Sequence, residues 1–272
     1  MAVRTFTDQM NRTVQLDFPP RRIVSLVPSQ TELLFDLGLG SEVVGITKFC
    51  IHPHDKFKST PKVGGTKALH LDRIRELQPD LILGNKEENQ QEQIETLMRE
   101  FPVWMSDIHT LEDAYGMIGA VGAMTGKAGE AASIADGIRA DFGKLTGAAV
   151  GAPRKRVLYL IWKDPYMAVG AGTFIHDVLE RGGWANAVPG GRYPELTAAA
   201  IREISPDVIF LSSEPYPFKE RHVEEFRWLC PGSAVMPVDG ELFSWYGSRL
   251  KKTPGYLFSL QEAVNQQQSD FY

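Results

Sequence analysis

The chain has 272 residues, a length typical of about two domains, and its 43% hydrophobic and 23% charged residues are typical of a globular protein. The net charge of -5 comes from 29 basic and 34 acidic residues that are well mixed along the chain, so nucleic acid is not an expected partner. The longest apolar run, residues 157–162, is far shorter than the ~18 residues of a membrane span.

The first twenty residues lack a basic start followed by an apolar run of about 7–15 residues, so they predict no secretory signal. The two cysteines, Cys50 and Cys230, are too few and too far apart for a disulfide framework, and they are typical of a reducing compartment. We therefore expect a cytoplasmic protein. The alternative is a periplasmic protein whose leader has been removed.

Strands and helices are expected to alternate after Pro20. A β-branched apolar run at residues 22–27 predicts a buried parallel strand that Pro28 ends, and the capping-box spacing from Ser29 predicts a helix after it. The first half should then contain strands at residues 43–49, 80–83 and 102–105 and helices at 71–78, 89–100 and 110–125.

One long helix is expected next, because residues 127–146 carry apolar side chains at three-four spacing without a proline. At about 1.5 Å per residue it should be about 30 Å long. Strands and helices then alternate again, with strands expected at residues 156–162, 207–211 and 234–238 and helices at 173–181, 197–204, 218–229 and 256–264.

An internal similarity links the two halves of the chain. Residues 74–83 (IRELQPDLIL) align with residues 201–210 (IREISPDVIF) at an offset of 127 positions. We therefore predict two related α/β lobes with mainly parallel sheets, at residues 21–126 and 150–265, joined by a connecting helix at 127–149. Ligands bind at the carboxyl ends of such strands, so the predicted ligand site is a cleft between the lobes.

Four segments carry a resemblance to a known family, with a weaker match at residues 239–249. They are residues 22–32 (RIVSLVPSQTE), 63–83, 156–162 and 200–211. Through them the chain resembles the helical-backbone (class III) substrate-binding proteins of ABC importers, in particular the members that bind cobalamin or iron chelates. The resemblance implies two Rossmann-like lobes on a single backbone helix, a small hinge motion, a monomer and no enzymatic activity.

The resemblance also implies ligand contacts. It places Phe49 and Tyr193 as aromatic contacts and Arg249 as a cleft arginine that takes a carboxylate or phosphate. Thr66 and Asn85 fall where cobalamin-binding members have tryptophans, and aromatic residues elsewhere in this chain are expected to rebuild the flat wall. The expected ligand contacts are Pro28, Ser29, Phe49, Cys50, His52, Thr66, Asn85, Trp162, Tyr166, Tyr193, Phe243, Trp245, Tyr246 and Arg249.

Two further functions stay open. A siderophore or haem binder would use the same scaffold. A metal-dependent or cysteine enzyme would use Cys50, His52 and His54, because cysteine and histidine are good ligands for zinc or copper and alternate residues of an extended segment face one way. The main expectation has no catalytic residue and no resident metal or cofactor, only a bound cobalamin or other metal chelate.

Docking on a permease is implied by the resemblance, in which one acidic residue per lobe meets arginines of the importer. Asp72 matches in the first lobe. In the second lobe the matching position is Ala199, and Glu195 lies four residues upstream. We therefore hypothesise that the chain binds its ligand without feeding an importer in the usual way.

Overall fold

The computed structural model describes residues 2–148 and 153–269. Two compact units make up the chain. The division falls inside the long helix, between Gly137 and Ile138, rather than on either side of it. Unit 1 contains residues 2–108, Glu112–Gly137 and Tyr246–Arg249, and unit 2 contains His109–Leu111, Ile138–Trp245 and residues 250–269.

Unit 1 is built on a parallel four-stranded sheet with the order β4-β3-β5-β6. Its strands are β3 (Ile23–Ser25), β4 (Val43–Ile46), β5 (Leu81–Asn85) and β6 (Val103–Ser106), and a separate hairpin is formed by β1 (Ala2–Thr7) and β2 (Thr13–Phe18). Its helices are α1 (Pro28–Asp36), α2 (His54–Ser59), α3 (Leu71–Leu77), α4 (Gln91–Met98), α5 (Leu111–Thr125) and the first part of α6 (Ala128–Ala148).

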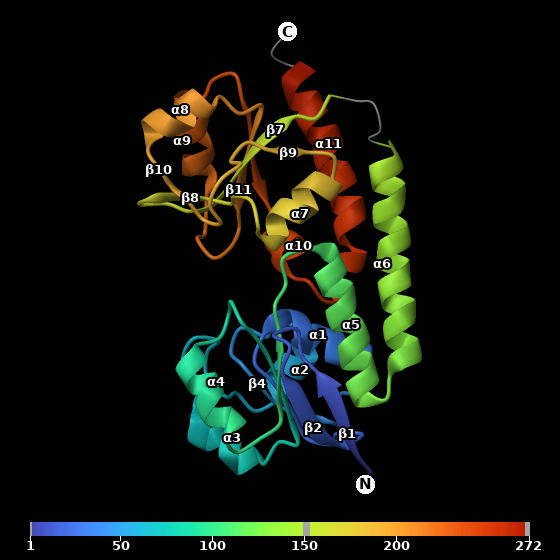
Figure 1. The fold of residues 1–272 in the computed structure, drawn as a ribbon. Helices are drawn as coiled ribbons and strands as arrows, with labels where there is room; N and C mark the ends of the chain where they lie inside the picture. Colours follow the sequence, from blue (N-terminus) through green and yellow to red (C-terminus); the bar gives the residue numbers. More distant parts are fainter. Residues whose placement is uncertain (1, 149–152, 270–272) are drawn as a thin grey trace. The chain divides into compact units, whose positions relative to one another are not determined.

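Alternation along the strands of unit 1 decides what covers each face of its sheet. Val24 and Ile82 belong to one buried cluster with Ile74 of α3 and Leu97 of α4, so these two helices cover that face (Figure 1). The indole of Trp104 points the other way and donates to the carbonyl of residue 7 in the hairpin at 3.1 Å. The sequence analysis did not anticipate this hairpin.

The start of α1 differs from the prediction. Pro28 is the first residue of the helix rather than the end of the strand, and Val27 is the N-cap, with no side-chain capping bond. Proline is well suited to this position because the N–H groups of a first helical turn have no acceptor within the helix. The capping box predicted from Ser29 was therefore wrong.

The predicted long helix is confirmed as α6. Two residues, Gly126 and Lys127, separate it from the end of α5. Gly126 has a φ of 75°, a left-handed conformation that suits glycine, and it reverses the chain there. Gly122 of α5 allows close helix packing, because a Cβ there would lie 2.3 Å from the Cβ of Ala131. The two helices accordingly pack side by side at this end of α6 (Figure 1).

Unit 2 contains a mixed six-stranded sheet with the order β10-β8-β7-β11-β12, in which β9 also pairs with β7. Its parallel strands are β7 (Arg156–Trp162), β11 (Val208–Ser212) and β12 (Ala234–Val238), and three shorter strands complete it: β8 (Tyr166–Ala168), β9 (Ala185–Asn186) and β10 (Glu195–Leu196). The helices are α7 (Phe174–Arg181), α8 (Ala198–Ile204), α9 (Glu220–Leu229), α10 (Glu241–Ser244), a 3-10 turn (Ser248–Lys251) that starts in unit 1, and α11 (Thr253–Ser269).

Each face of the unit 2 sheet has its own core. Leu158 and Leu160 of β7 cluster with Ile201 of α8 and Phe226 of α9. Tyr159, which lies between the two leucines in the chain, faces the opposite layer and packs edge-on against Phe243 of α10 at 5.0 Å between ring centroids. The predicted α/β fold with mainly parallel sheets is therefore confirmed.

The internal similarity corresponds to the same local structure in both units. α3 and α8 each end in a left-handed C-cap residue, Gln78 with a φ of 43° and Ser205 with a φ of 46°. These residues are 127 positions apart, which is the offset found in the sequence. Each helix is followed by Pro-Asp and then by a buried strand, β5 or β11.

The aspartate of this repeat has the same structural role in each unit. Asp80 accepts backbone N–H bonds from Arg21 and Arg22 at 2.7 and 2.8 Å, and Asp207 accepts one from Arg156 at 2.7 Å. The guanidinium groups of Arg22 and Arg156 in turn donate to carbonyls at the C-terminal ends of α3 and α8. The repeat therefore ties each helix end to the first strand of its own sheet.

Candidate functional site

The carboxyl edge of the unit 1 sheet presents one exposed aromatic side chain. β4 ends at Ile46, earlier than predicted, so Phe49 lies in the following loop with 50% of its surface exposed. Its ring lies 3.3 Å from the point where a Cβ on Gly65 would be, and the ammonium of Lys48 lies 5.1 Å from the ring centroid. Glycine at position 65 thus lets the ring lie flat against the neighbouring loop.

Behind this loop the same edge is filled by a buried amide and hydroxyl network. The Asn85 amide donates to the Ser106 hydroxyl at 3.0 Å, and its carbonyl oxygen accepts from the N–H groups of Glu87 and Glu88 at 2.8 and 3.0 Å. The Gln30 amide donates to the same Ser106 hydroxyl at 2.8 Å. Asn85 is therefore buried and shapes the loop after β5, rather than facing outward as predicted.

The start of α1 is buried as well. Pro28 and Ser29 are both enclosed within unit 1, so the structure does not present them on an open surface. Thr66 is half-buried, and its carbonyl accepts a 3.0 Å bond from the Asn89 amide. Of the contacts predicted in unit 1, Phe49, His52 and Thr66 keep some exposure.

Cys50 is fully buried and is surrounded by hydroxyl groups. Its Sγ lies 3.1 Å from the hydroxyls of Thr31 and Thr47, and burial raises the pKa of the thiol to about 11. The thiol is therefore protonated at neutral pH, whereas a nucleophile or a metal ligand must be a thiolate. His52 is half-buried and His54 is exposed.

The expected metal ligands do not come together in the structure. Among residues 2–148 and 153–269, no group of three histidine, cysteine or acidic side chains is placed to hold a metal ion. The enzyme alternative built on Cys50, His52 and His54 is thus not favoured by the structure.

Tyr246 and Arg249 were predicted to contact ligand, but both side chains are paired within unit 1. The Tyr246 hydroxyl donates to Glu88 at 2.7 Å, and both burial and the charge of Glu88 raise the pKa of the phenol well above its ordinary value. The Arg249 guanidinium donates to both carboxylate oxygens of Glu32 at 2.8 and 2.9 Å. Arg249 already has a buried anionic partner, so it is not presented as a free receptor for a ligand carboxylate.

The carboxyl edge of the unit 2 sheet carries an exposed tryptophan. Trp162 is the last residue of β7 and has 40% of its surface exposed. Its indole packs edge-on against Tyr216 at 5.5 Å between ring centroids, and Tyr216 packs against Phe218 at 4.8 Å. The three rings form a supported aromatic surface at the end of this strand.

Tyr216 and Phe218 were missed by the sequence analysis. They lie just after β11, in the stretch Glu214–Phe218 (EPYPF). The available signal was a strand end followed directly by aromatic residues that alternate with prolines, which is the same kind of position that drew attention to Trp162. Loops at the carboxyl ends of parallel strands are where such side chains meet ligands.

Tyr166 is half-buried and belongs to a charged cluster beside this surface. Its hydroxyl donates to Glu225 at 2.5 Å, and Lys163 forms an ion pair with the same carboxylate. Burial, together with the hydrogen bond to Glu225, raises the pKa of the phenol to about 12. Tyr193 is also half-buried, with the Arg192 guanidinium 5.9 Å from its ring centroid.

Phe243 and Trp245 were predicted to face a ligand, but both are buried in unit 2. Phe243 is fully enclosed and packs against Tyr159 and Tyr256 as part of the core beneath β7 and β11. Between the two aromatic residues, the Ser244 hydroxyl donates to Glu214 at 2.7 Å. The predicted aromatic surface at residues 241–246 is therefore mostly core.

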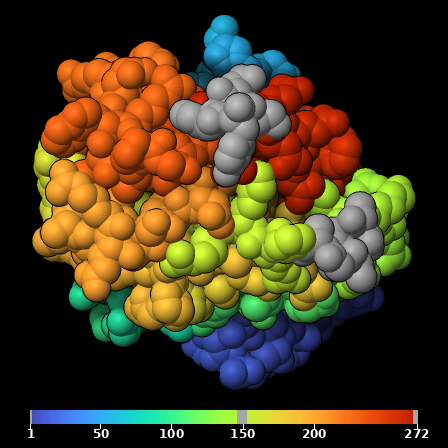
Figure 2. Space-filling model, turned by 90° about the horizontal axis from the view of Figure 1, so that it is seen from above, coloured from blue at the N-terminus to red at the C-terminus, as the bar shows by residue number. Residues whose placement is uncertain are grey.

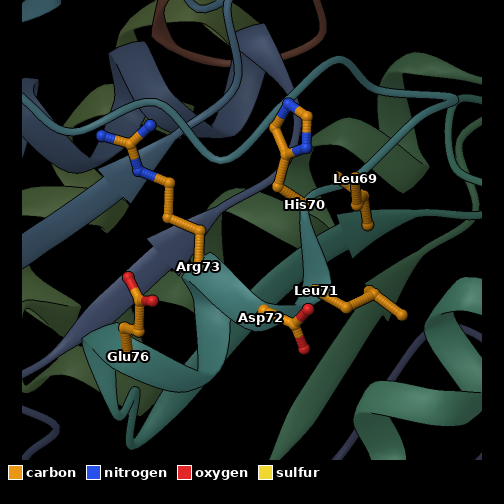
Figure 3. A pocket seen from close by; sticks show the side chains of 6 residues that line it. All are labelled: Leu69, His70, Leu71, Asp72, Arg73 and Glu76. Carbon is orange, nitrogen blue, oxygen red and sulfur yellow. The ribbon is translucent and has the colours of Figure 1, made fainter.

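The two residues predicted to dock on a permease lie on exposed positions. Asp72 begins the first turn of α3, with 92% of its side chain exposed, and pairs with Arg75 at 2.7 Å. Figure 3 shows a pocket at this helix, with Arg73 and His70 directed to one side and Asp72 to the other. Glu195 is exposed at the start of β10.

Comparisons with known proteins point to one family. The family model described as periplasmic binding protein matches residues 23–227. The vitamin B12-binding protein of Pectobacterium carotovorum is 25% identical over 85% of this chain and 84% of its own length.

Two solved structures share the fold. The periplasmic vitamin B12-binding protein of Vibrio cholerae aligns with a TM-score of 0.79 and 19% identity over 92% of this chain and 99% of its own. A periplasmic heme-binding protein from Pseudomonas aeruginosa aligns with a TM-score of 0.76 and 21% identity over 89% of this chain and 92% of its own.

These comparisons do not support the predicted cytoplasmic location, because the family whose model matches is described as periplasmic binding protein. They agree with the alternative that the sequence analysis kept open. Within the part of the chain that the structure describes, no helix combines the length and the apolar character needed to cross a membrane.

Proposed function

Since the chain belongs to the periplasmic binding protein family, we propose that it is a non-enzymatic binding protein for a flat metal chelate, either cobalamin and related corrinoids or haem. The observation that carries this proposal is the exposed indole of Trp162, supported by Tyr216 at the carboxyl end of β7. Flat conjugated ligands stack on such rings.

Unit 1 contributes a second aromatic surface to the proposal. Phe49 is exposed in the loop after β4, at the corresponding edge of its own sheet. Cobalamin and haem both present wide apolar faces, so an exposed ring in each unit supports a ligand of this kind better than a small polar solute. The buried and protonated Cys50 supports a binding role over a cysteine enzyme.

The test is a titration of the purified protein with hydroxocobalamin and, separately, with hemin, followed by visible absorbance and tryptophan fluorescence. Stacking on an aromatic ring contributes about 0.5–1.5 kcal/mol beyond the area it buries, so Trp162→Ala should weaken binding by about two- to tenfold and Phe49→Ala by a smaller factor. A shift of the corrin bands identifies a corrinoid ligand, and a shift of the Soret band identifies haem.

Trp228→Ala is the matched control, because Trp228 is also exposed, at 80%, but lies on α9 rather than at a strand end. The α8–α9 region, drawn in orange, lies on the outside of the molecule (Figure 2). Equal losses of affinity in the Trp162 and Trp228 variants, or no spectral change with either chelate, would contradict the proposal.

We also propose that the protein works outside the cytoplasmic membrane and delivers its ligand to an ABC importer. The periplasmic description of the similar structures and the exposed side chain of Asp72 support this. Stimulation of the cognate importer's ATPase in lipid vesicles tests it, with Asp72→Asn expected to reduce the stimulation and Glu76→Gln on the same helix as control. If the wild-type protein does not stimulate the importer's ATPase, the result would instead support ligand binding without delivery.

A further inference from the structure

The chain links the two units at more than one place. α6 passes from unit 1 to unit 2 between Gly137 and Ile138, as a connecting helix does. The chain also crosses at His109–Leu111, three residues of unit 2 within a stretch of unit 1. A further link lies more than a hundred residues after the crossing in α6, where Tyr246–Arg249 belongs to unit 1 although the chain on both sides of it belongs to unit 2. We call these four residues the strap.

Both ends of the strap are anchored on unit 1 by side chains. At its first residue, the Tyr246 hydroxyl donates to Glu88 at 2.7 Å, and Ser106 also hydrogen-bonds with the phenol. At its last residue, Arg249 forms a bidentate pair with Glu32. Both members of that ion pair are largely buried, and a bidentate guanidinium–carboxylate pair fixes orientation as well as position.

The middle of the strap lies directly against α1. A Cβ on Gly247 would be 2.2 Å from the carbonyl oxygen of Ser29, so only glycine fits this approach. Ser248 is buried beside it, and its hydroxyl is one of the buried polar atoms without a hydrogen-bond partner among the residues that the structure describes. The strap is thus held by the side-chain hydrogen bonds at its two ends and by the close packing of Gly247 against α1. The Ser248 hydroxyl adds no hydrogen bond among the described residues.

We propose that the strap is a restraint on the relative motion of the two units, additional to α6 and to the crossing at His109–Leu111, and that Glu32 and Glu88 are its anchoring residues. One helix by itself leaves the units free to bend and twist about it. A further covalent path that is fixed at both ends removes part of that freedom, so hinge motion is smaller than it would be without the strap. The strap also holds the Glu88 loop after β5, and it therefore orders the carboxyl edge of unit 1.

The experiment measures unit motion in the ligand-free protein, so its result does not depend on the proposed function. Nitroxide labels are attached at Glu76→Cys on α3 and Glu203→Cys on α8, two exposed positions 127 residues apart, with Cys50 and Cys230 replaced by alanine. Pulsed electron paramagnetic resonance then gives the width of the distance distribution. Hydrogen–deuterium exchange of the peptide that contains the strap is measured in parallel.

Glu32→Gln should broaden the distance distribution and raise strap exchange at least about tenfold, and Tyr246→Phe should do both to a smaller extent. Glu100→Gln is the matched control, because it removes an exposed ion pair with Arg75 in the same unit. Faster strap exchange without a broader distribution, or no change in either quantity, overturns the proposal. If Glu32→Gln does not fold, Tyr246→Phe decides by the same two readouts.

Discussion

Units 1 and 2 repeat one helix–strand arrangement but use the carboxyl edges of their sheets differently. In unit 1 the strap and the Asn85 network fill the edge beside β5, and Phe49 is exposed only on the β4 side. In unit 2 the edge beside β7 carries the exposed Trp162 on its aromatic support. The shared helix–strand arrangement therefore fixes the position of the carboxyl edge in each sheet. Other segments of the chain, such as the strap in unit 1, determine how much of that edge is exposed.

The repeat also separates structural from functional residues. Asp80 and Asp207 bind backbone N–H groups at the same point of each repeat. Asp72 instead pairs with the Arg75 side chain, and the corresponding position in unit 2 is Ala199. The aspartate that accepts backbone bonds therefore occurs in both units, whereas the exposed aspartate of α3 occurs in unit 1 alone.

The largest loss of stability should come from replacing a large core side chain of either unit by alanine. Trp104 in unit 1 and Phe210 in unit 2 are fully buried, and each alanine variant should lower the free energy of unfolding by about 3–5 kcal/mol. Urea unfolding followed by circular dichroism measures both. Phe258→Ala, at an exposed position of α11, should change it by less than about 0.5 kcal/mol. A core variant that behaves like this control would contradict the assignment of that ring to the core.

The next effect should separate the two repeated aspartates. Asp80 accepts two backbone bonds and Asp207 accepts one backbone bond from the neighbouring strand. Asp80→Ala should therefore cost about 1–2 kcal/mol of stability and Asp207→Ala about half as much. Thermal unfolding provides the comparison, with Asp141→Ala, at a half-exposed position of α6, as the control. A larger loss of stability in Asp207→Ala than in Asp80→Ala would contradict the assumption that each backbone hydrogen bond contributes similarly in the two repeats.

A smaller, pH-dependent difference concerns buried carboxyl groups. Glu32 of unit 1 is paired with Arg249, but Glu214 of unit 2 has its pKa raised, chiefly by burial. The folded state therefore holds the Glu214 proton more tightly than the unfolded state does. Its contribution to stability is present below the ordinary carboxyl pKa and is lost as pH rises through the raised folded value.

Glu214→Gln should accordingly make stability fall less as the pH rises above the ordinary carboxyl pKa. Chemical unfolding at several pH values measures the slope, and Glu203→Gln, at an exposed position of α8, should leave it unchanged. An unaltered slope in the Glu214 variant would show that another group carries the dependence.

The smallest effect should be in thiol reactivity. Burial raises the pKa of both cysteines, to about 11 for Cys50, and Cys230 keeps slightly more exposure. Iodoacetamide at pH 8 should modify both slowly, and Cys230 before Cys50, because the thiolate is the reactive form. Mass spectrometry of timed samples gives the order. Faster labelling of Cys50 would mean that its loop opens in solution.

Much of the fold could be predicted because its signals are local. β7 was predicted with its observed bounds, and the long helix differs from α6 by one or two residues at its ends. The Pro-Asp repeat predicted two related lobes. The hairpin of β1 and β2 was missed; β1 has no buried residue, and β2 buries only Val14 and Leu16.

The candidate site was less predictable because burial depends on distant parts of the chain. Trp162 and Phe243 both occur in aromatic-rich segments near strand ends, yet one is exposed and the other is enclosed by Tyr159 and Tyr256. The pairing of Arg249 with Glu32 spans 217 positions and leaves no local signal. Local pattern therefore locates candidate loops, but it does not tell which of their side chains the rest of the chain covers.

The strap has a consequence for synthesis on the ribosome. Unit 1 includes four residues that are translated more than a hundred positions after its last helix has begun, so its fold stays incomplete until Arg249 has emerged. Until then, Glu32 lacks its ion pair with Arg249 and Glu88 lacks its hydrogen bond from Tyr246. A nascent chain of this protein cannot finish its first half before its second, and premature termination anywhere before residue 246 would leave both halves unfinished.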